Sequence, residues 1–165
     1  MIPEIDALAA ELVTMLQAQG RSFATAESCT GGAISQAVTS VAGCSSVMRG
    51  AVVAYHNDVK EKVLGVSGGV LATYGAVSEE TVVQMVDGVS ALMGADCAVA
   101  TSGIAGPGGG TPEKPVGTVW LAAKVGGVVK TRLLSLEDHG RASNIRSTVE
   151  EALLLVIAML SDDKV

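Results

Sequence analysis

The sequence predicts an α/β protein, and two observations carry this prediction. Segments typical of buried strands alternate with segments typical of helices along most of the 165 residues. In addition, 48% of the residues are hydrophobic but only 2% are aromatic, so the core must be built from small and aliphatic side chains, as in layered α/β folds. A chain of this length fits one domain, and we expect residues 1–165 to form a single domain.

The first half of the chain predicts two helix-and-strand alternations after an opening helix. Residues 3–19 place apolar side chains such as Ile5, Leu8 and Leu12 at helical spacing, with Gly20 at the end. The segments that follow are expected to be a short buried strand at 21–27, a helix of small residues at 30–43, a second strand at 48–56 and a helical segment at 57–65.

The second half predicts a long helix, three strands and a closing helix. Residues 78–94 form a strongly amphipathic pattern that begins with Ser78 in a capping position. The elements expected after it are a third strand at 95–103, a hairpin of strands at 118–125 and 128–136, and a helix at 141–160. The intervening stretch 103–117 has five glycines among its first eight residues and three prolines, so it cannot be regular structure. Loops of this length in compact domains are usually functional.

The charge balance and the cysteines exclude several classes of protein. The net charge of −6 and the lack of a Lys/Arg cluster exclude nucleic acid as the main partner. Three widely spaced cysteines without a C-x-x-C pair indicate a reducing cytoplasm, and the acidic N-terminus does not resemble a signal peptide. Because no apolar run reaches about 18 residues, we expect a cytoplasmic protein that has no membrane contact. His56 and His139 lack the paired spacing of a zinc site, so we expect no metal.

Three loops that follow expected strands carry unusual chemistry. They are "ESCTGG" at 27–32, "YHNDVK" at 55–60 and "TSGIAGPGGGTPEKP" at 101–115. Because ligands bind at the carboxyl ends of strands in open α/β sheets, these loops predict a binding or catalytic site. The glycine-rich loop matches neither a phosphate-binding P-loop nor a dinucleotide fingerprint, but its backbone N–H groups suit phosphate or carboxylate.

Each of these loops also has a purely structural interpretation. Ser28 is either a helix cap or a nucleophile at the positive end of a helix. Tyr55 and Lys60 are either a strand-end aromatic with a solvated lysine or a catalytic pair. The stretch "GVSGG" at 65–69 matches the nucleophile-elbow pattern G-x-S-x-G, with His139 as a base. It follows a helical segment rather than a strand, so we reject Ser67 as a nucleophile.

Four motifs in order give the chain a resemblance to a known family. They are "TAESCTGG", "GAVVAYHNDVKEKVLGV", "YGAVSEET" and "TSGIAGPGGGTPEKPVGTVW". Over roughly residues 5–160 the chain resembles the CinA C-terminal family, whose members are nicotinamide-nucleotide amidohydrolases. The resemblance implies a three-layer α/β/α sandwich and a homo-oligomer. The molybdopterin-binding-like domain of longer relatives is not in this sequence, so we expect the stand-alone form.

The resemblance also implies an activity and a set of site residues. The activity is hydrolysis of the carboxamide of nicotinamide mononucleotide (NMN) to nicotinate mononucleotide and ammonia, without a cofactor or metal. The catalytic residues implied are the nucleophile Ser28 with Tyr55 and Lys60. The substrate-binding residues implied are Glu27, Thr30, Gly31, Gly32, Asn57, Ser102, Gly103, Gly106, Gly108, Arg141 and Arg146. Glu27 is expected to orient its neighbours, and Cys29 is an alternative nucleophile.

Two departures from the family pattern affect the expected substrate site. Ser102 stands where the family usually has threonine, and the hydroxyl is kept. Relatives commonly place a second arginine four residues after the first, whereas Arg141 and Arg146 are five apart, so either could contact the phosphate. Two other functions stay open at this point. One is a nucleotide-binding module without turnover, and the other is hydrolysis of a different small amide.

Overall fold

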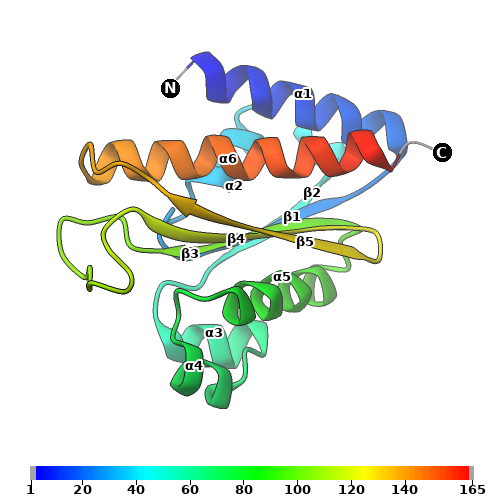
Figure 1. Ribbon diagram of the computed structural model, residues 1–165. Helices are drawn as coiled ribbons and strands as arrows, with labels where there is room; N and C mark the ends of the chain where they lie inside the picture. The colour runs from blue at the N-terminus through cyan, green and yellow to red at the C-terminus, as the bar shows by residue number, and fades with distance from the viewer. Residues whose placement is uncertain (1–2, 164–165) are drawn as a thin grey trace.

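The computed structural model describes residues 3–163 and shows a five-stranded mixed sheet covered by helices on both faces (Figure 1). The strands lie in the order β2-β1-β3-β4-β5. Strand β1 runs parallel to β2 and β3, whereas β3–β4 and β4–β5 are antiparallel pairs. The strands are β1 (Phe23–Glu27), β2 (Met48–Val53), β3 (Cys97–Gly103), β4 (Thr118–Val125) and β5 (Val128–Ser135).

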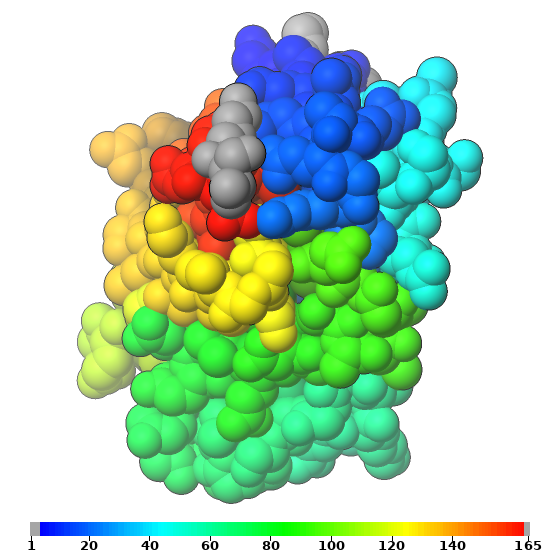
Figure 2. Space-filling view, turned by 90° about the vertical axis from the view of Figure 1, so that its right-hand side faces the viewer, coloured from blue at the N-terminus to red at the C-terminus, as the bar shows by residue number. Residues whose placement is uncertain are grey.

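The helices form the two outer layers, which confirms the expected α/β/α sandwich. Helices α1 (Pro3–Gln19), α2 (Ala33–Thr39) and α6 (Arg141–Asp162) cover one face, and α3 (Asn57–Leu64), α4 (Gly68–Tyr74) and α5 (Glu79–Met93) lie on the other. In Figure 2, α1 in blue packs beside the end of α6 in red, and the green and blue-green helices form the opposite layer. No helix within residues 3–163 is long and apolar enough to cross a membrane.

In the central strands, polar and apolar residues do not alternate clearly, because both faces of the sheet are covered. All five residues of β1 are buried, because helices cover both sides of it. Phe23 faces the core beneath α1 and α6, whereas Ala24 faces the core on α5. Ala98 and Ala100 of β3 also belong to the core on α5, and their small side chains let this helix pack close to the sheet.

The structure corrects two of the helical predictions, and the expected strands at 21–27, 48–56 and 95–103 are shorter by two or three residues. The helix expected over 30–43 begins at Ala33 and ends at Thr39, and a short 3₁₀ helix follows at Cys44–Ser46. Helix α4 was not predicted, because it begins with two glycines and has no apolar face that is fully buried. The Ser67 hydroxyl accepts from the Val70 N–H (3.4 Å) and caps α4. Ser67 is therefore the N-cap of α4, and it follows helix α3 rather than a strand.

Candidate active site

A cleft of about 250 Å³ lies where β1, β2 and β3 end, at the carboxyl edge of the parallel part of the sheet. Its volume is slightly below the range of typical small-ligand sites. All three loops that the sequence singled out contribute to its walls. The lining residues are Ser28, Cys29, Tyr55, Asn57, Lys60, Ala76, Val77, Ser102, Gly103, Ile104, Ala105, Gly106, Gly108, Gly109 and Arg141.

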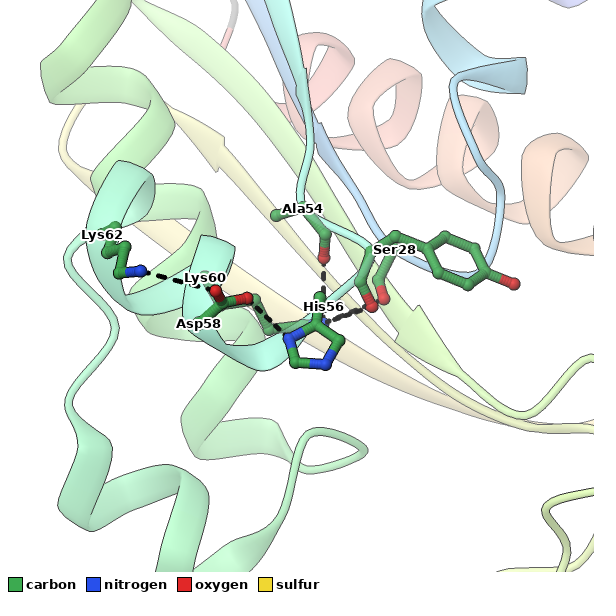
Figure 3. Close-up of polar contacts among 7 residues, drawn as sticks. Ser28, Ala54, His56, Asp58, Lys60 and Lys62 are labelled. Atoms are coloured by element: carbon green, nitrogen blue, oxygen red, sulfur yellow. Dashed lines mark hydrogen bonds and ion pairs between the residues drawn. The ribbon is translucent and has the colours of Figure 1, made fainter.

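Ser28 and Lys60 are in direct contact at the floor of this cleft. Ser28 follows the last residue of β1, and Lys60 is the fourth residue of α3, which begins just beyond the end of β2. The Nζ atom of Lys60 lies 3.0 Å from Oγ of Ser28 and 2.9 Å from the carbonyl oxygen of Ala54 (Figure 3). The structure thus brings together the two side chains that the resemblance pairs.

Burial sets the electrostatics of Lys60. The side chain is 1% exposed, and desolvation lowers the pKa of its amine from the usual 10.5. Within residues 3–163, no Asp or Glu forms an ion pair with it. A neutral amine has two N–H donors and one lone pair. The amine has three acceptors around it, namely Oγ of Ser28, the Ala54 carbonyl and the more distant Tyr55 carbonyl (3.5 Å). In its neutral form the amine could keep both carbonyl contacts and turn its lone pair toward the Ser28 hydroxyl.

Glu27 caps a helix, a role that was not predicted from the sequence. Its buried carboxylate accepts from the hydroxyls of Thr25 (3.0 Å) and Thr30 (2.8 Å) and from the N–H groups of Ile34 (2.9 Å) and Ser35 (3.0 Å). These two N–H groups belong to the first turn of α2, whose N-cap is a glycine without a side chain. Glu27 therefore caps α2 from a distance and fixes the turn that carries the nucleophile candidate.

This arrangement rules out the capping interpretation of Ser28. The N-cap of α2 is Gly32, and Ser28 precedes it by four residues. Neither Gly31 nor Gly32 lines the cleft, and their positive φ angles of 60° and 100° serve the tight turn between β1 and α2. The Ser28 hydroxyl is left to face Lys60.

Cys29 is a poor nucleophile in this environment. Its side chain belongs to the core beneath α1 and α6, although it also borders the cleft. Burial raises the pKa of the thiol to about 11, so the thiolate is scarcely populated at neutral pH.

The backbone N–H of Cys29 has a different use. It has no acceptor among the described residues and immediately follows Ser28. A donor at this position suits the oxyanion of a tetrahedral intermediate.

The side chain of Tyr55 borders the cleft and contacts Arg141, whereas only the Tyr55 backbone carbonyl contacts Lys60. Its hydroxyl accepts from Nη2 of Arg141 (2.7 Å), and Nη1 of the same guanidinium donates to the Gly106 carbonyl (2.8 Å). In the described part of the chain, the Tyr55 hydroxyl forms no hydrogen bond to Ser28 or Lys60. Any assistance from Tyr55 to proton transfer is therefore indirect in this state.

The expected substrate-binding residues divide into three groups. Asn57, Ser102, Gly103, Gly106, Gly108 and Arg141 line the cleft. Glu27, Thr30, Gly31 and Gly32 lie outside its lining and build the turn beside it. Arg146 lines a different cavity, together with Ile5, Ala33, Gln36, Ala37, Ala142, Ile145 and Val149. The geometry thus places Arg141, and not Arg146, at the cleft.

Sequence reasoning missed two of the contacts that build the site. The Ala54 carbonyl contacts Lys60, but no residue type marks a backbone acceptor in advance. Asn144 lies one helical turn after Arg141 and donates to the Ala105 carbonyl (3.0 Å), a contact that i, i+3 spacing from Arg141 could have suggested.

Comparisons with known proteins agree with this architecture. The family model for the CinA C-terminal domain matches residues 5–160. A CinA-like protein of Cytophaga hutchinsonii is 47% identical over 98% of this chain, and one of Akkermansia muciniphila is 50% identical over 86%. The chain spans only 38% and 34% of the lengths of these curated relatives.

Solved structures give the same result along nearly the whole length of both chains. The competence/damage inducible protein CihA from Agrobacterium tumefaciens is 44% identical with a TM-score of 0.94, covering 96% of this chain and 97% of its own. The competence damage-inducible protein A (ComA) from Klebsiella pneumoniae is 36% identical with a TM-score of 0.93, covering 97% and 99%. This protein therefore belongs to the CinA C-terminal domain family.

Proposed function

We propose that this protein hydrolyses the carboxamide of NMN to nicotinate mononucleotide and ammonia. The observation that carries the proposal is the buried Lys60 amine, which lies 3.0 Å from the Ser28 hydroxyl with no acidic partner in residues 3–163. An ordinary structural lysine would be exposed or paired with a carboxylate, because burying an unpaired ammonium is costly. A buried amine of lowered pKa beside a serine is instead what a serine–lysine hydrolase needs.

The first half of the reaction uses Lys60 as a base. As Oγ of Ser28 attacks the carboxamide carbon, its proton passes to the neutral amine of Lys60. The carbonyl oxygen becomes an oxyanion, for which the Cys29 N–H is a candidate donor. The ammonium of Lys60 then returns its proton to the amide nitrogen, the C–N bond breaks, ammonia leaves and the nicotinoyl group stays as an ester on Ser28.

The second half repeats the proton transfers with water. Lys60, neutral again, takes a proton from a water molecule as that water attacks the ester carbon. Collapse of the second tetrahedral intermediate breaks the bond to Oγ, and Lys60 returns the proton to Ser28. The product is released as the carboxylic acid, which loses its proton to solvent near neutral pH, and Ser28 and Lys60 are back in their starting states.

Ammonia release measures this proposal directly. We expect the purified protein to release ammonia from NMN faster than from nicotinamide, nicotinamide riboside or NAD. Release from a different small amide, but not from NMN, would identify another amidohydrolase. Binding of NMN without any ammonia release would support a nucleotide-binding module and overturn the enzymatic proposal.

Hydrolysis of NMN is expected to be independent of added metal. In residues 3–163, no three His, Cys, Asp or Glu side chains are grouped so that they could hold an ion, and His56 is paired with Asp58 at 2.6 Å. The proposed steps use only Ser28, Lys60, the Cys29 N–H and water. Ammonia release should therefore be unchanged in EDTA. Loss of activity on chelation, with recovery on adding a divalent ion, would contradict the metal-free mechanism.

Arg141 is the proposed contact for the phosphate of NMN. Its guanidinium is held at the cleft by Tyr55 and Gly106, which leaves further N–H donors for an anion. Arg141→Ala should weaken NMN binding by about 1.5–3 kcal/mol and leave nicotinamide riboside nearly unaffected. Arg146→Ala is the matched control, because Arg146 lines another cavity. Equal effects of Arg141→Ala on both substrates, measured as KM or Kd, would exclude phosphate as its target.

A further inference from the structure

The glycine-rich loop is held by the first turn of α6 through two consecutive carbonyl groups. Arg141 Nη1 donates to the carbonyl of Gly106 (2.8 Å), and Nδ2 of Asn144 donates to the carbonyl of Ala105 (3.0 Å). Both Ala105 and Gly106 line the cleft, whereas Asn144 is 2% exposed and lies outside its lining. Asn144 therefore acts on the cleft only through the loop.

The orientation of the Asn144 amide follows from its hydrogen bonds. Its nitrogen contacts two acceptors, the Ala105 carbonyl and Oδ1 of Asp138 (3.2 Å), so this atom must be the NH₂ group. Asp138 is fixed in turn, because the same oxygen accepts from the Gly140 N–H (3.0 Å). The donor to Ala105 is thus set by a second contact that does not involve the loop.

The direction of one carbonyl determines the direction of the next N–H. In residues 3–163 the only cis peptide bond is Gly106–Pro107, so the peptide between Ala105 and Gly106 is trans. In a planar trans peptide the C=O and N–H point in opposite directions. With the Ala105 carbonyl turned toward the buried Asn144 amide, the N–H of Gly106 points away from Asn144. No acceptor among the described residues takes this N–H.

We infer that Asn144 is a positioning residue that presents the Gly106 N–H to an anionic oxygen of the ligand, beside Arg141. The inference rests on the proposed function for the identity of the anion, which is the phosphate of a pyridine mononucleotide. A backbone N–H beside a guanidinium is a common pairing for phosphate oxygens. Gly106 itself cannot be replaced in a test, because its φ is 85° and an added Cβ would lie 2.6 Å from Cγ1 of Val116.

Binding of the product separates this role from catalysis. We would measure the Kd of nicotinate mononucleotide and of nicotinate riboside, which lacks the phosphate, by calorimetry with the full chain. Asn144→Leu removes the donor to Ala105, and Asn144→Asp keeps the shape but replaces the donor by an acceptor. Both variants should bind the mononucleotide about tenfold more weakly or worse, while riboside binding changes less than about twofold.

Thr148 provides the matched control. It is buried in α6 one turn after Asn144, and its hydroxyl donates to the Asn144 carbonyl (2.7 Å) without touching the loop. Thr148→Val should leave both Kd values unchanged, although it also removes a buried hydrogen bond. Equal losses for both ligands in the Asn144 variants, or unchanged mononucleotide binding, would overturn the inference.

Failure of the proposed function and failure of the inference about Asn144 give different experimental results. If the wild-type chain binds the mononucleotide in a phosphate-dependent manner but releases no ammonia from NMN, the enzymatic proposal fails, whereas the inference about Asn144 is decided by the binding of its variants alone. If the wild-type chain does not bind nicotinate mononucleotide, the inference is overturned, whatever the chain does to NMN.

Discussion

Ser28→Ala is expected to reduce ammonia release from NMN by more than about 10³-fold, the scale of other nucleophile deletions. The fold should survive, because the Ser28 hydroxyl contacts only Lys60 among the described side chains and does not cap α2. Loss of this one hydrogen bond should lower the free energy of unfolding by only about 1 kcal/mol. Ammonia assays and urea unfolding of the same preparation measure both quantities.

Cys29→Ala is the matched control for the nucleophile. The buried thiol has a pKa of about 11, and truncation of a partly core side chain should cost stability more than activity. The variant should therefore retain much of the turnover of the wild-type protein. An active Ser28→Ala protein together with an inactive Cys29→Ala protein would reverse the assignment of the nucleophile.

Lys60→Arg should remove most of the activity while NMN still binds. Arginine keeps the positive charge but cannot release its proton near neutral pH, so it cannot act as the base. A loss of roughly 10²–10⁴-fold in kcat is expected for the absence of a general base. Lys62→Arg is the control, because Lys62 is an exposed residue of the same helix that pairs with Asp58. It should behave like the wild-type protein.

The pH profile gives an independent measure of the same residue. The base must be neutral before substrate binds, so kcat/KM should rise with pH and level off above the pKa of the Lys60 amine. Burial lowers this pKa, so the rise should occur below the usual 10.5. Substantial turnover by Lys60→Arg with an unshifted profile would remove Lys60 as the base and return the role to Glu27 or water. The four hydrogen bonds on Glu27 already argue against the first of these.

Local sequence patterns predicted the elements that are stabilised by contacts between residues close together in the sequence. The helix at 78–94 was predicted from its amphipathic pattern and from Ser78, whose hydroxyl accepts from the Thr81 N–H (3.2 Å). The hairpin was predicted from two apolar runs about Gly126–Gly127, and β4 and β5 pair around that turn. The start of α2 was missed because its first N–H groups are capped by Glu27, seven residues before Ile34. Such a cap exists only once β1 and α2 pack together.

For the candidate site too, some features were predicted from the sequence and others were decided only by the tertiary structure. The sequence by itself determined the α/β class, the three loops with unusual chemistry and their position after strands, because composition, periodicity and strand ends are properties of the chain order. It did not determine which arginine lies at the cleft, since Arg141 and Arg146 are equivalent until α6 is docked on the sheet. The lowered pKa of Lys60 was likewise decided by the tertiary structure, because desolvation depends on everything that packs around the amine, including segments distant in the sequence.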